Sequence, residues 1–119
     1  MGLFDLAGFD AFVSGLPGVT LVDQWEARVA KAGGKVFALL GADGNGKGRI
    51  VFKCGEDSFE ILTASEGVSQ APYFAKRQWV SVESAAGLAE DELEAYIRRS
   101  HALVARGLTK KLRQELGIA

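Results

Sequence analysis

The sequence predicts a single α+β domain in which helical segments flank a run of short strands. Its length of 119 residues is close to the commonest size of one domain, and 48% hydrophobic with 24% charged residues is typical of a folded chain. Apolar residues recur at helical intervals near both ends and alternate, or run together, in short segments between them. We therefore expect one hydrophobic core built from helices and a sheet.

The first predicted element is an amphipathic helix between Asp5 and Leu16. Pro17 and Gly18 end it, because proline restricts the residue before it and glycine adopts backbone angles that other residues resist. The apolar positions on one side of this helix are Leu6, Phe9, Phe12, Val13 and Leu16.

Two short strands are predicted next, at residues 19–22 and 25–29. In the second, Trp25 and the other apolar residues alternate with charged ones, which indicates that one face of the sheet meets water there. Gly33-Gly34 predicts a turn into an almost wholly apolar strand at residues 35–40.

The glycine-rich segment 41–48 is predicted to connect that strand to another at residues 49–54, forming a hairpin. Residues 56–65 predict a short helix, because two acidic residues at its start suit the positive end of the helix dipole. A final strand is predicted at residues 78–84, where aromatic and β-branched residues gather.

Two helices are predicted after the last strand. The longer one, from about Glu90 to Arg106, has acidic residues at its start and basic residues toward its end, as the helix dipole favours. The shorter one, at residues 109–116, can be capped by Thr109. The inner stripe of the longer helix is predicted to be Leu93, Tyr96, Ile97, Ser100 and Val104.

Segment 41–48 comes within one residue of the phosphate-binding loop pattern, but Gly48 stands where a Ser or Thr is required. A strand is predicted after it, whereas that pattern feeds a helix N-terminus. It also fails as a calcium-binding EF-hand loop, since Lys47 and Cys54 occupy ligand positions. We interpret the segment as a hairpin tip.

We predict no catalytic residues, no metal site and no cofactor. His101 is the only histidine and Cys54 the only cysteine, which excludes multi-histidine and multi-cysteine metal sites within one chain. Burial is the simplest expectation for Cys54, and a packing or surface role for His101. An enzyme is therefore the least favoured of the functions considered.

The charge and the cysteine content indicate which compartment and which partners suit the protein. The formal net charge is -1 and the isoelectric point is about 5.8, so no global positive field draws the chain to nucleic acid or to an anionic membrane. A lone cysteine fits a reducing compartment, and no apolar run approaches membrane-spanning length. We expect a cytoplasmic protein with no membrane partner.

One candidate binding surface is a basic run near the C-terminus that contains no carboxylate. Such a patch can bind phosphates through counterion release, the effect that supplies sequence-independent DNA affinity. The alternative is that the cations simply favour helix C-termini and solvated faces. The predicted nucleic-acid-binding residues are Arg98, Arg99, Arg106, Lys110, Lys111 and Arg113.

A second candidate surface is segment 72–79, PYFAKRQW, which sets two cations among three aromatic residues. That mixture can stack on bases or hold an anion, although the aromatic residues can equally belong to the core. The residues predicted for a ligand or partner surface are Lys53, Tyr73, Lys76, Arg77 and Trp79.

Several strings resemble, in order and over nearly the whole chain, the MmcQ/YjbR family of small bacterial proteins. The resemblance implies a CyaY-like α+β fold of two layers, an antiparallel sheet of about five strands with helices packed on one face. The family is commonly labelled DNA-binding, and no catalytic residues come with that label. The resembling strings are LPGV (16–19), GGKVFALL (33–40), IVFKC (50–54), APYFAKRQWVSV (71–82) and LTKKLRQEL (108–116).

The chain departs from the family pattern in two places. Many members carry Asn-Lys-x-His-Trp where residues 75–79 here read Ala-Lys-Arg-Gln-Trp, so a role that needs the Asn and His is in doubt. The CyaY-like fold is shared with frataxin, whose iron binding depends on an acidic first helix. The first helix here offers only Asp5 and Asp10, so we predict no iron site.

Taken together, the sequence favours a small non-catalytic binding protein. The first hypothesis is DNA binding through the basic run, which predicts a steep dependence on salt. The alternative is a module that binds a protein or a small anionic ligand through the sheet and segment 72–79, which predicts binding that changes little with salt.

Overall fold

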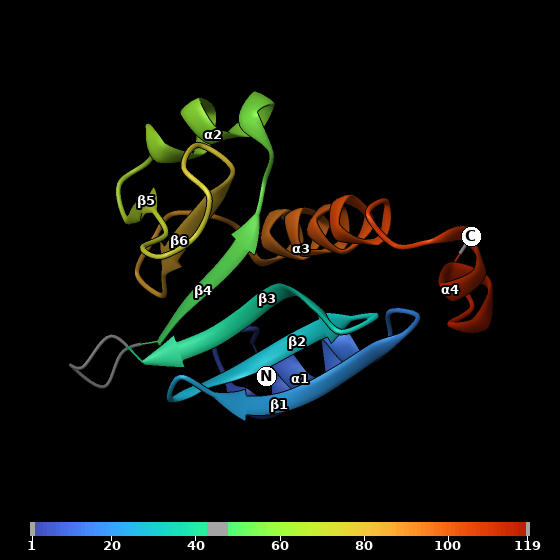
Figure 1. Cartoon of the computed structure of the whole chain (residues 1–119). Coiled ribbons are helices and arrows are strands. Elements are labelled where there is room, and N and C mark those ends of the chain that lie inside the picture. The colour runs from blue at the N-terminus through green and yellow to red at the C-terminus, as the bar shows by residue number, and fades with distance from the viewer. Residues whose placement is uncertain (1, 43–47, 119) are drawn as a thin grey trace.

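A six-stranded antiparallel sheet forms the centre of the fold, which was obtained as a computed structural model and is described for residues 2–42 and 48–118. The strands are β1 Val19–Gln24, β2 Ala27–Ala32, β3 Lys35–Ala42, β4 Gly48–Lys53, β5 Val68–Gln70 and β6 Trp79–Glu83. Their order across the sheet is β1-β2-β3-β4-β6-β5 (Figure 1). The α+β class is confirmed, and the strand that sequence analysis did not predict is the short β5.

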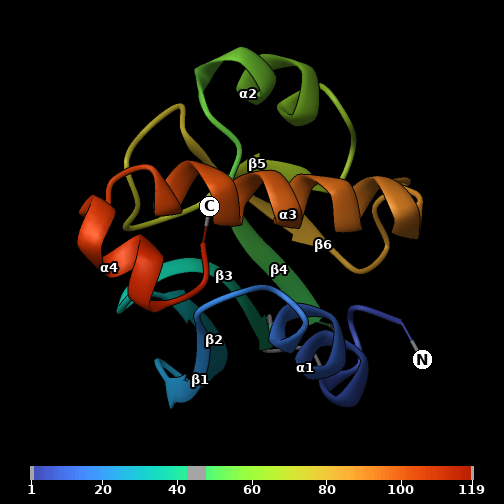
Figure 2. The ribbon, with the colours of Figure 1, turned by 90° about the vertical axis from the view of Figure 1, so that its right-hand side faces the viewer.

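The described residues also form four helices: α1 Leu6–Ser14, α2 Glu56–Thr63, α3 Glu90–Ala105 and α4 Lys110–Glu115. Each begins and ends within about two residues of its prediction. In Figure 2, α3 crosses in front of β4 and β6, and α1 lies below it. The predicted cap of α4 is confirmed, because the hydroxyl of Thr109 accepts a hydrogen bond from the Leu112 amide at 3.1 Å. The tip of the hairpin predicted at 41–48 lies outside the described residues.

The connection between β1 and β2 differs from the prediction. Trp25 and Glu26, expected within a strand, form a two-residue turn with φ values of 56° and 58°. Positive φ at both positions is type I′ geometry, whose twist matches the twist of the flanking strands. Strand pairing has thus outweighed the strand preference of the tryptophan. The turn carries Trp25 to the tip of the hairpin, where it is 62% exposed.

One face of the sheet, here called the sealed face, packs against α1, α2 and α3. Phe37 and Phe52 are fully buried there, beneath Ile97 of α3 and Phe9 of α1. Burial of side chains of this size supplies most of the free energy that stabilises a small domain. The expected packing of helices on one face is therefore seen.

A β-bulge in β3 lies next to a serine of α3 that forms hydrogen bonds with two strands. Ala30 pairs with Ala38 and the next pair skips Phe37, which breaks the hydrogen-bond ladder there. The buried hydroxyl of Ser100 donates to the Phe37 carbonyl at 2.6 Å and accepts from the Lys53 amide at 2.9 Å. Ser100 therefore links the Phe37 carbonyl of β3 to the Lys53 amide of β4, one residue beyond the β3–β4 pair of Ala38 and Phe52, and satisfies both backbone groups.

His101 and Cys54 are also buried on this side of the sheet. The ring of His101 meets Phe37 edge to face at 5.1 Å, and its Nε2 lies 2.8 Å from the carbonyl oxygen of Pro17. Burial raises the pKa of the Cys54 thiol. Both residues occupy packing positions.

The opposite face, here called the open face, is covered only in part. Its apolar cluster contains no helical residue in the described parts of the chain. The cover comes from residues 71–78, the connection between β5 and β6, in which Phe74 stacks on Trp79 at 4.5 Å between ring centroids. The buried members of the cluster are Val29, Leu39, Val51, Ala71 and Trp79.

Candidate ligand-binding groove and basic end

A groove lies on the open face, between the β1–β2 turn and the connection 71–78. Its volume is about 590 Å³, which is within the range of small-molecule sites. Its floor is apolar and is made by Ala27, Leu39 and Val51 from three adjacent strands. Leu39 and Val51 are direct partners across β3 and β4, so their side chains point to the same face.

Aromatic side chains line the groove from opposite sides. Trp25 comes from the β1–β2 turn and Tyr73 from the connection 71–78. Tyr73 is fully exposed and, like Trp25, has a positive φ, here 70°. Bulky residues seldom adopt this conformation, which costs on the order of 1 kcal/mol. The fold thus maintains two strained backbone positions that present large aromatic groups to solvent.

One cation lies in the groove. Arg49 of β4 lines it, with Gly41 and Glu83 as its cross-strand partners. The Nε atom of Arg49 is shielded from solvent, and no hydrogen-bond acceptor for it is found among the described residues. A shielded donor without an acceptor costs about 1–3 kcal/mol.

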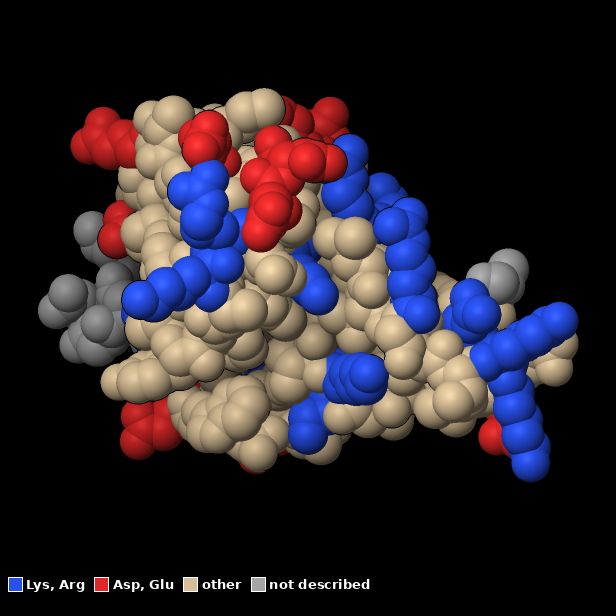
Figure 3. All heavy atoms as spheres, turned by 45° about the horizontal axis from the view of Figure 1, so that its top comes forward, with Lys and Arg blue, Asp and Glu red and all other residues tan. Residues whose placement is uncertain are grey.

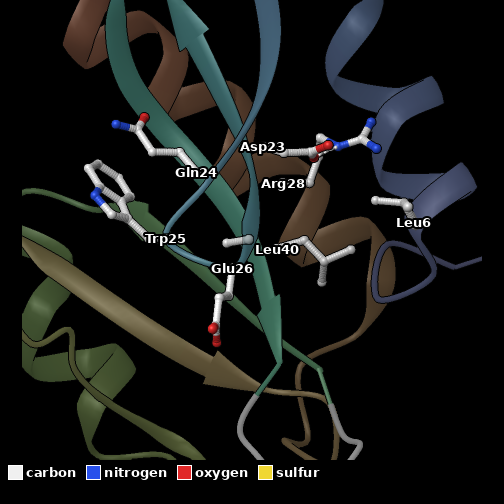
Figure 4. Close-up of a pocket in the computed structure, with 8 residues that line it drawn as sticks. Leu6, Asp23, Gln24, Trp25, Glu26, Arg28 and Leu40 are labelled. Carbon is white, nitrogen blue, oxygen red and sulfur yellow. Dashed lines mark hydrogen bonds and ion pairs between the residues drawn. The ribbon is translucent and has the colours of Figure 1, made fainter.

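A second hollow, of about 470 Å³, lies on the other side of the same hairpin end (Figure 4). Trp25 points away from Arg28 and Leu6, which lie toward α1. The charge of Arg28 is already paired, because its guanidinium lies 2.6 Å from Asp10 and 2.7 Å from Asp23. The hydrogen bond with Asp23 raises the pKa of Arg28. The ion pairs of Arg28 link the hairpin to α1 beside this hollow, whereas the Oδ1 atom of Asp10 is shielded and has no hydrogen-bond donor among the described residues.

The residues predicted for a ligand or partner surface are only partly brought together. Tyr73 lines the groove, whereas Trp79 is buried beneath the connection 71–78. Lys53 is half-buried on β4, opposite Trp79 across the strands, and Lys76 is exposed. Arg77 is not among the residues that line the groove.

The guanidinium of Arg77 reaches α2. Its Nη2 lies 2.6 Å from the Glu60 carboxylate, and its central carbon lies 5.5 Å from the centre of the Phe59 ring. Arg77 therefore holds the connection 71–78 against α2 and does not line the groove.

Sequence analysis missed most of the groove, including Trp25, Arg49, Leu39 and Val51. A usable signal was present, because the strands at 35–40 and 49–54 are apolar at consecutive positions. Strands of that kind are buried on both faces, so some segment has to cover the second face.

The two arginines of α3 point to different neighbours. Arg98 lies over the Phe12 ring of α1 at 5.0 Å and 3.9 Å from Glu94. Arg99 donates to the Ser58 hydroxyl of α2 at 3.1 Å. The six predicted cations therefore do not form one continuous face.

The other four predicted cations lie at the α4 end of the molecule, where Figure 3 shows Lys and Arg side chains projecting into solvent. The ammonium of Lys35 joins them, 3.4 Å from the Gly107 carbonyl between α3 and α4. None of the ion pairs among the described residues involves this group. We call the group the basic end: Lys35, Arg106, Lys110, Lys111 and Arg113.

Two further properties concern metals and membranes. No group of three or more His, Cys, Asp or Glu residues in segments 2–42 and 48–118 is placed to hold a metal ion. None of the helices in these same segments has the length and apolar character that crossing a membrane requires.

Solved structures that share this fold include two proteins of low sequence identity. Deinococcus radiodurans protein DR2400, with a DUF419 domain, has a TM-score of 0.82 and 23% identity, and the match covers 96% of this chain and 88% of that protein. A protein from Pseudomonas syringae has a TM-score of 0.70 and 19% identity, over 84% of this chain and 98% of that one. No curated protein matched the chain. The sequence matches the YjbR family over residues 14–103, and the chain therefore belongs to the YjbR family.

Proposed function

We propose that this protein is a non-catalytic small-ligand-binding protein and that the groove on the open face is its site. The observation that carries the proposal is a groove with an apolar floor that is lined by two exposed aromatic side chains, Trp25 and Tyr73. Burying one such side chain contributes roughly 1.5–3 kcal/mol. A ligand that binds in the groove would bury such a side chain and be stabilised by this free energy. The groove is already present without a ligand.

The groove supports binding better than it supports catalysis. Among the described residues that line it are one arginine, one glutamate and one tyrosine, but no nucleophile paired with a base. The chain's only cysteine and only histidine, Cys54 and His101, are both buried on the sealed side of the sheet.

A fragment screen by saturation-transfer NMR tests the proposal. It compares the wild type with a groove variant, Trp25→Asn with Tyr73→Asn, in which asparagine tolerates the positive φ at both positions. The control variant, Lys110→Gln with Lys111→Gln, changes exposed residues of the basic end. We expect aromatic fragments to bind the wild type and the control and to lose binding to the groove variant. Equal binding to all three proteins, or no binding fragment, would contradict the proposal.

A second candidate function is binding of duplex DNA at the basic end. It is favoured by five cations at one end of the molecule, without ion-pair partners among the described residues. If all five contact phosphates, the salt dependence implies a loss of about 500-fold in affinity between about 50 and about 200 mM salt.

Fluorescence anisotropy of a labelled random-sequence duplex at those two salt concentrations tests this second candidate. The variant changes Arg106, Lys110, Lys111 and Arg113 to glutamate, and Lys76→Glu serves as the control. Salt-sensitive binding that only the fourfold variant loses supports DNA binding at the basic end. Absence of binding at the lower salt concentration rejects it and leaves the groove as the site.

A further inference from the structure

We infer that the groove takes a planar aromatic ligand that carries an anionic group, with the ring against Trp25 and Tyr73 and the anion toward Arg49. This inference rests on the proposed function and adds the chemical class of the ligand. Its two parts, the ring and the charge, come from different residues and can be tested separately.

The ring is inferred from the walls and the floor. Trp25 and Tyr73 face solvent, so their flat surfaces are available for stacking. Each stacked or edge-to-face aromatic pair adds roughly 2- to 10-fold in affinity beyond simple burial. Leu39 and Val51 add only a small apolar surface at the floor, because both side chains are mostly buried. A volume of about 590 Å³ suits one ring system with a substituent better than a folded partner.

The anion is inferred from Arg49, the one cation that lines the groove among the described residues. Its planar guanidinium matches a carboxylate, with which it can form two parallel hydrogen bonds. The Nε donor is shielded from solvent and has no acceptor in the described parts of the chain. Glu83 is its strand partner but forms no ion pair with it among the pairs found.

The other charge at the groove sets the orientation of the ligand. Glu26 lines it from the β1–β2 turn, one residue beyond Trp25. Like charges repel, so an anionic group is disfavoured at the turn and favoured at the Arg49 side. The ring is then left between the two aromatic walls, which agrees with the stacking argument.

Three probes of one size separate the ring from the charge. Naphthalene-2-carboxylate has both, naphthalene-2-carboxamide has the ring without the charge, and decahydronaphthalene-2-carboxylate has the charge without a flat ring. Binding is measured by protein-observed NMR on the wild type, on Arg49→Met, which keeps an apolar stem of similar length, and on Arg49→Lys, which keeps the charge. Urea unfolding of each variant verifies that it is folded.

For a ligand of this size we expect a Kd of roughly 1 mM for the aromatic carboxylate. The wild type should bind it about 10-fold more tightly than the carboxamide, a difference typical of a charge-assisted hydrogen bond. Arg49→Met should remove that difference and Arg49→Lys should retain part of it. The saturated carboxylate should bind several-fold more weakly than the aromatic one.

Each contrary result removes a defined part of the inference. Equal binding of carboxylate and carboxamide, or a preference that survives in Arg49→Met, overturns the anionic class. Equal or tighter binding of the saturated probe overturns the planar ring. Absence of binding by all three probes overturns the inference as a whole. The proposed function fails separately, only if the fragment screen finds no fragment that depends on Trp25 and Tyr73.

Discussion

The two faces of the sheet differ in how they are covered, although the same strands make both. Phe52 points to the sealed face, where it is fully buried and stacks on Tyr96 of α3, and its neighbour Val51 points to the open face, at the floor of the groove. The sealed face holds most of the large buried side chains. The open face holds a small cluster and two exposed aromatic residues. The difference indicates that one face stabilises the fold and the other is free to bind.

The largest expected effect is a difference in stability loss between substitutions at two neighbouring residues of β4. Phe52→Ala should lower the free energy of unfolding by about 3–5 kcal/mol, because it leaves a cavity in the sealed core. Val51→Ala should cost only about 1.5 kcal/mol, the value of two buried methyl groups. Urea unfolding of both variants measures the difference, and equal losses would mean that the two faces contribute alike.

A smaller loss of stability is expected when Ser100, which links the backbones of β3 and β4, is replaced. Ser100→Ala should cost about 2–3 kcal/mol, because the Phe37 carbonyl and the Lys53 amide lose their buried partner. Ser69→Ala, an exposed change on β5, is the control and should alter stability by less than about 0.5 kcal/mol. Thermal or urea unfolding would contradict this account if Ser100→Ala were as stable as the control.

The pH dependence of the free energy of unfolding tests whether the Cys54 thiol is buried. Its folded-state pKa is raised by burial, so the folded protein holds the thiol proton more firmly than the unfolded chain does. Its stabilising contribution is present below the ordinary thiol pKa of about 8.5 and is lost as pH rises through the folded value. As pH rises above about 8.5, the wild type should therefore lose more stability than Cys54→Ala. Parallel pH profiles of the two proteins would contradict this.

The smallest expected effect on stability is at the groove wall. Trp25→Asn should change the free energy of unfolding by less than about 0.5 kcal/mol, because the tryptophan is mostly exposed and asparagine tolerates its positive φ. The same change should weaken ligand binding. A large loss of stability in urea unfolding would show that Trp25 serves the fold instead of the site.

The sequence was sufficient to predict what depends on local pattern. The helices at both ends, the Gly33-Gly34 turn and the apolar strands follow from periodicity and turn chemistry. The type I′ turn at Trp25 was missed because the pairing of the strands, and not the preference of the residue, decides its conformation.

The candidate site was harder to predict, because it is assembled from segments far apart in the chain. Arg49 and Tyr73 meet at the groove only through the strand order and the path of the β5–β6 connection. Arg98 and Arg99 are adjacent in the sequence but contact different helices, since successive residues of a helix point about 100° apart. Spacing alone did not reveal either arrangement.

The central claim is that ligands bind the open face and not the basic end. Its most direct test is amide chemical-shift mapping on the isotope-labelled wild type during titration with the best fragment from the screen. We predict that the shifted amides cluster at the β1–β2 turn, at Leu39 and Gly41, at Arg49 and Val51, and at Tyr73 and Phe74. Shifts confined to α4 and the C-terminal part of α3, with the groove unchanged, would contradict the account.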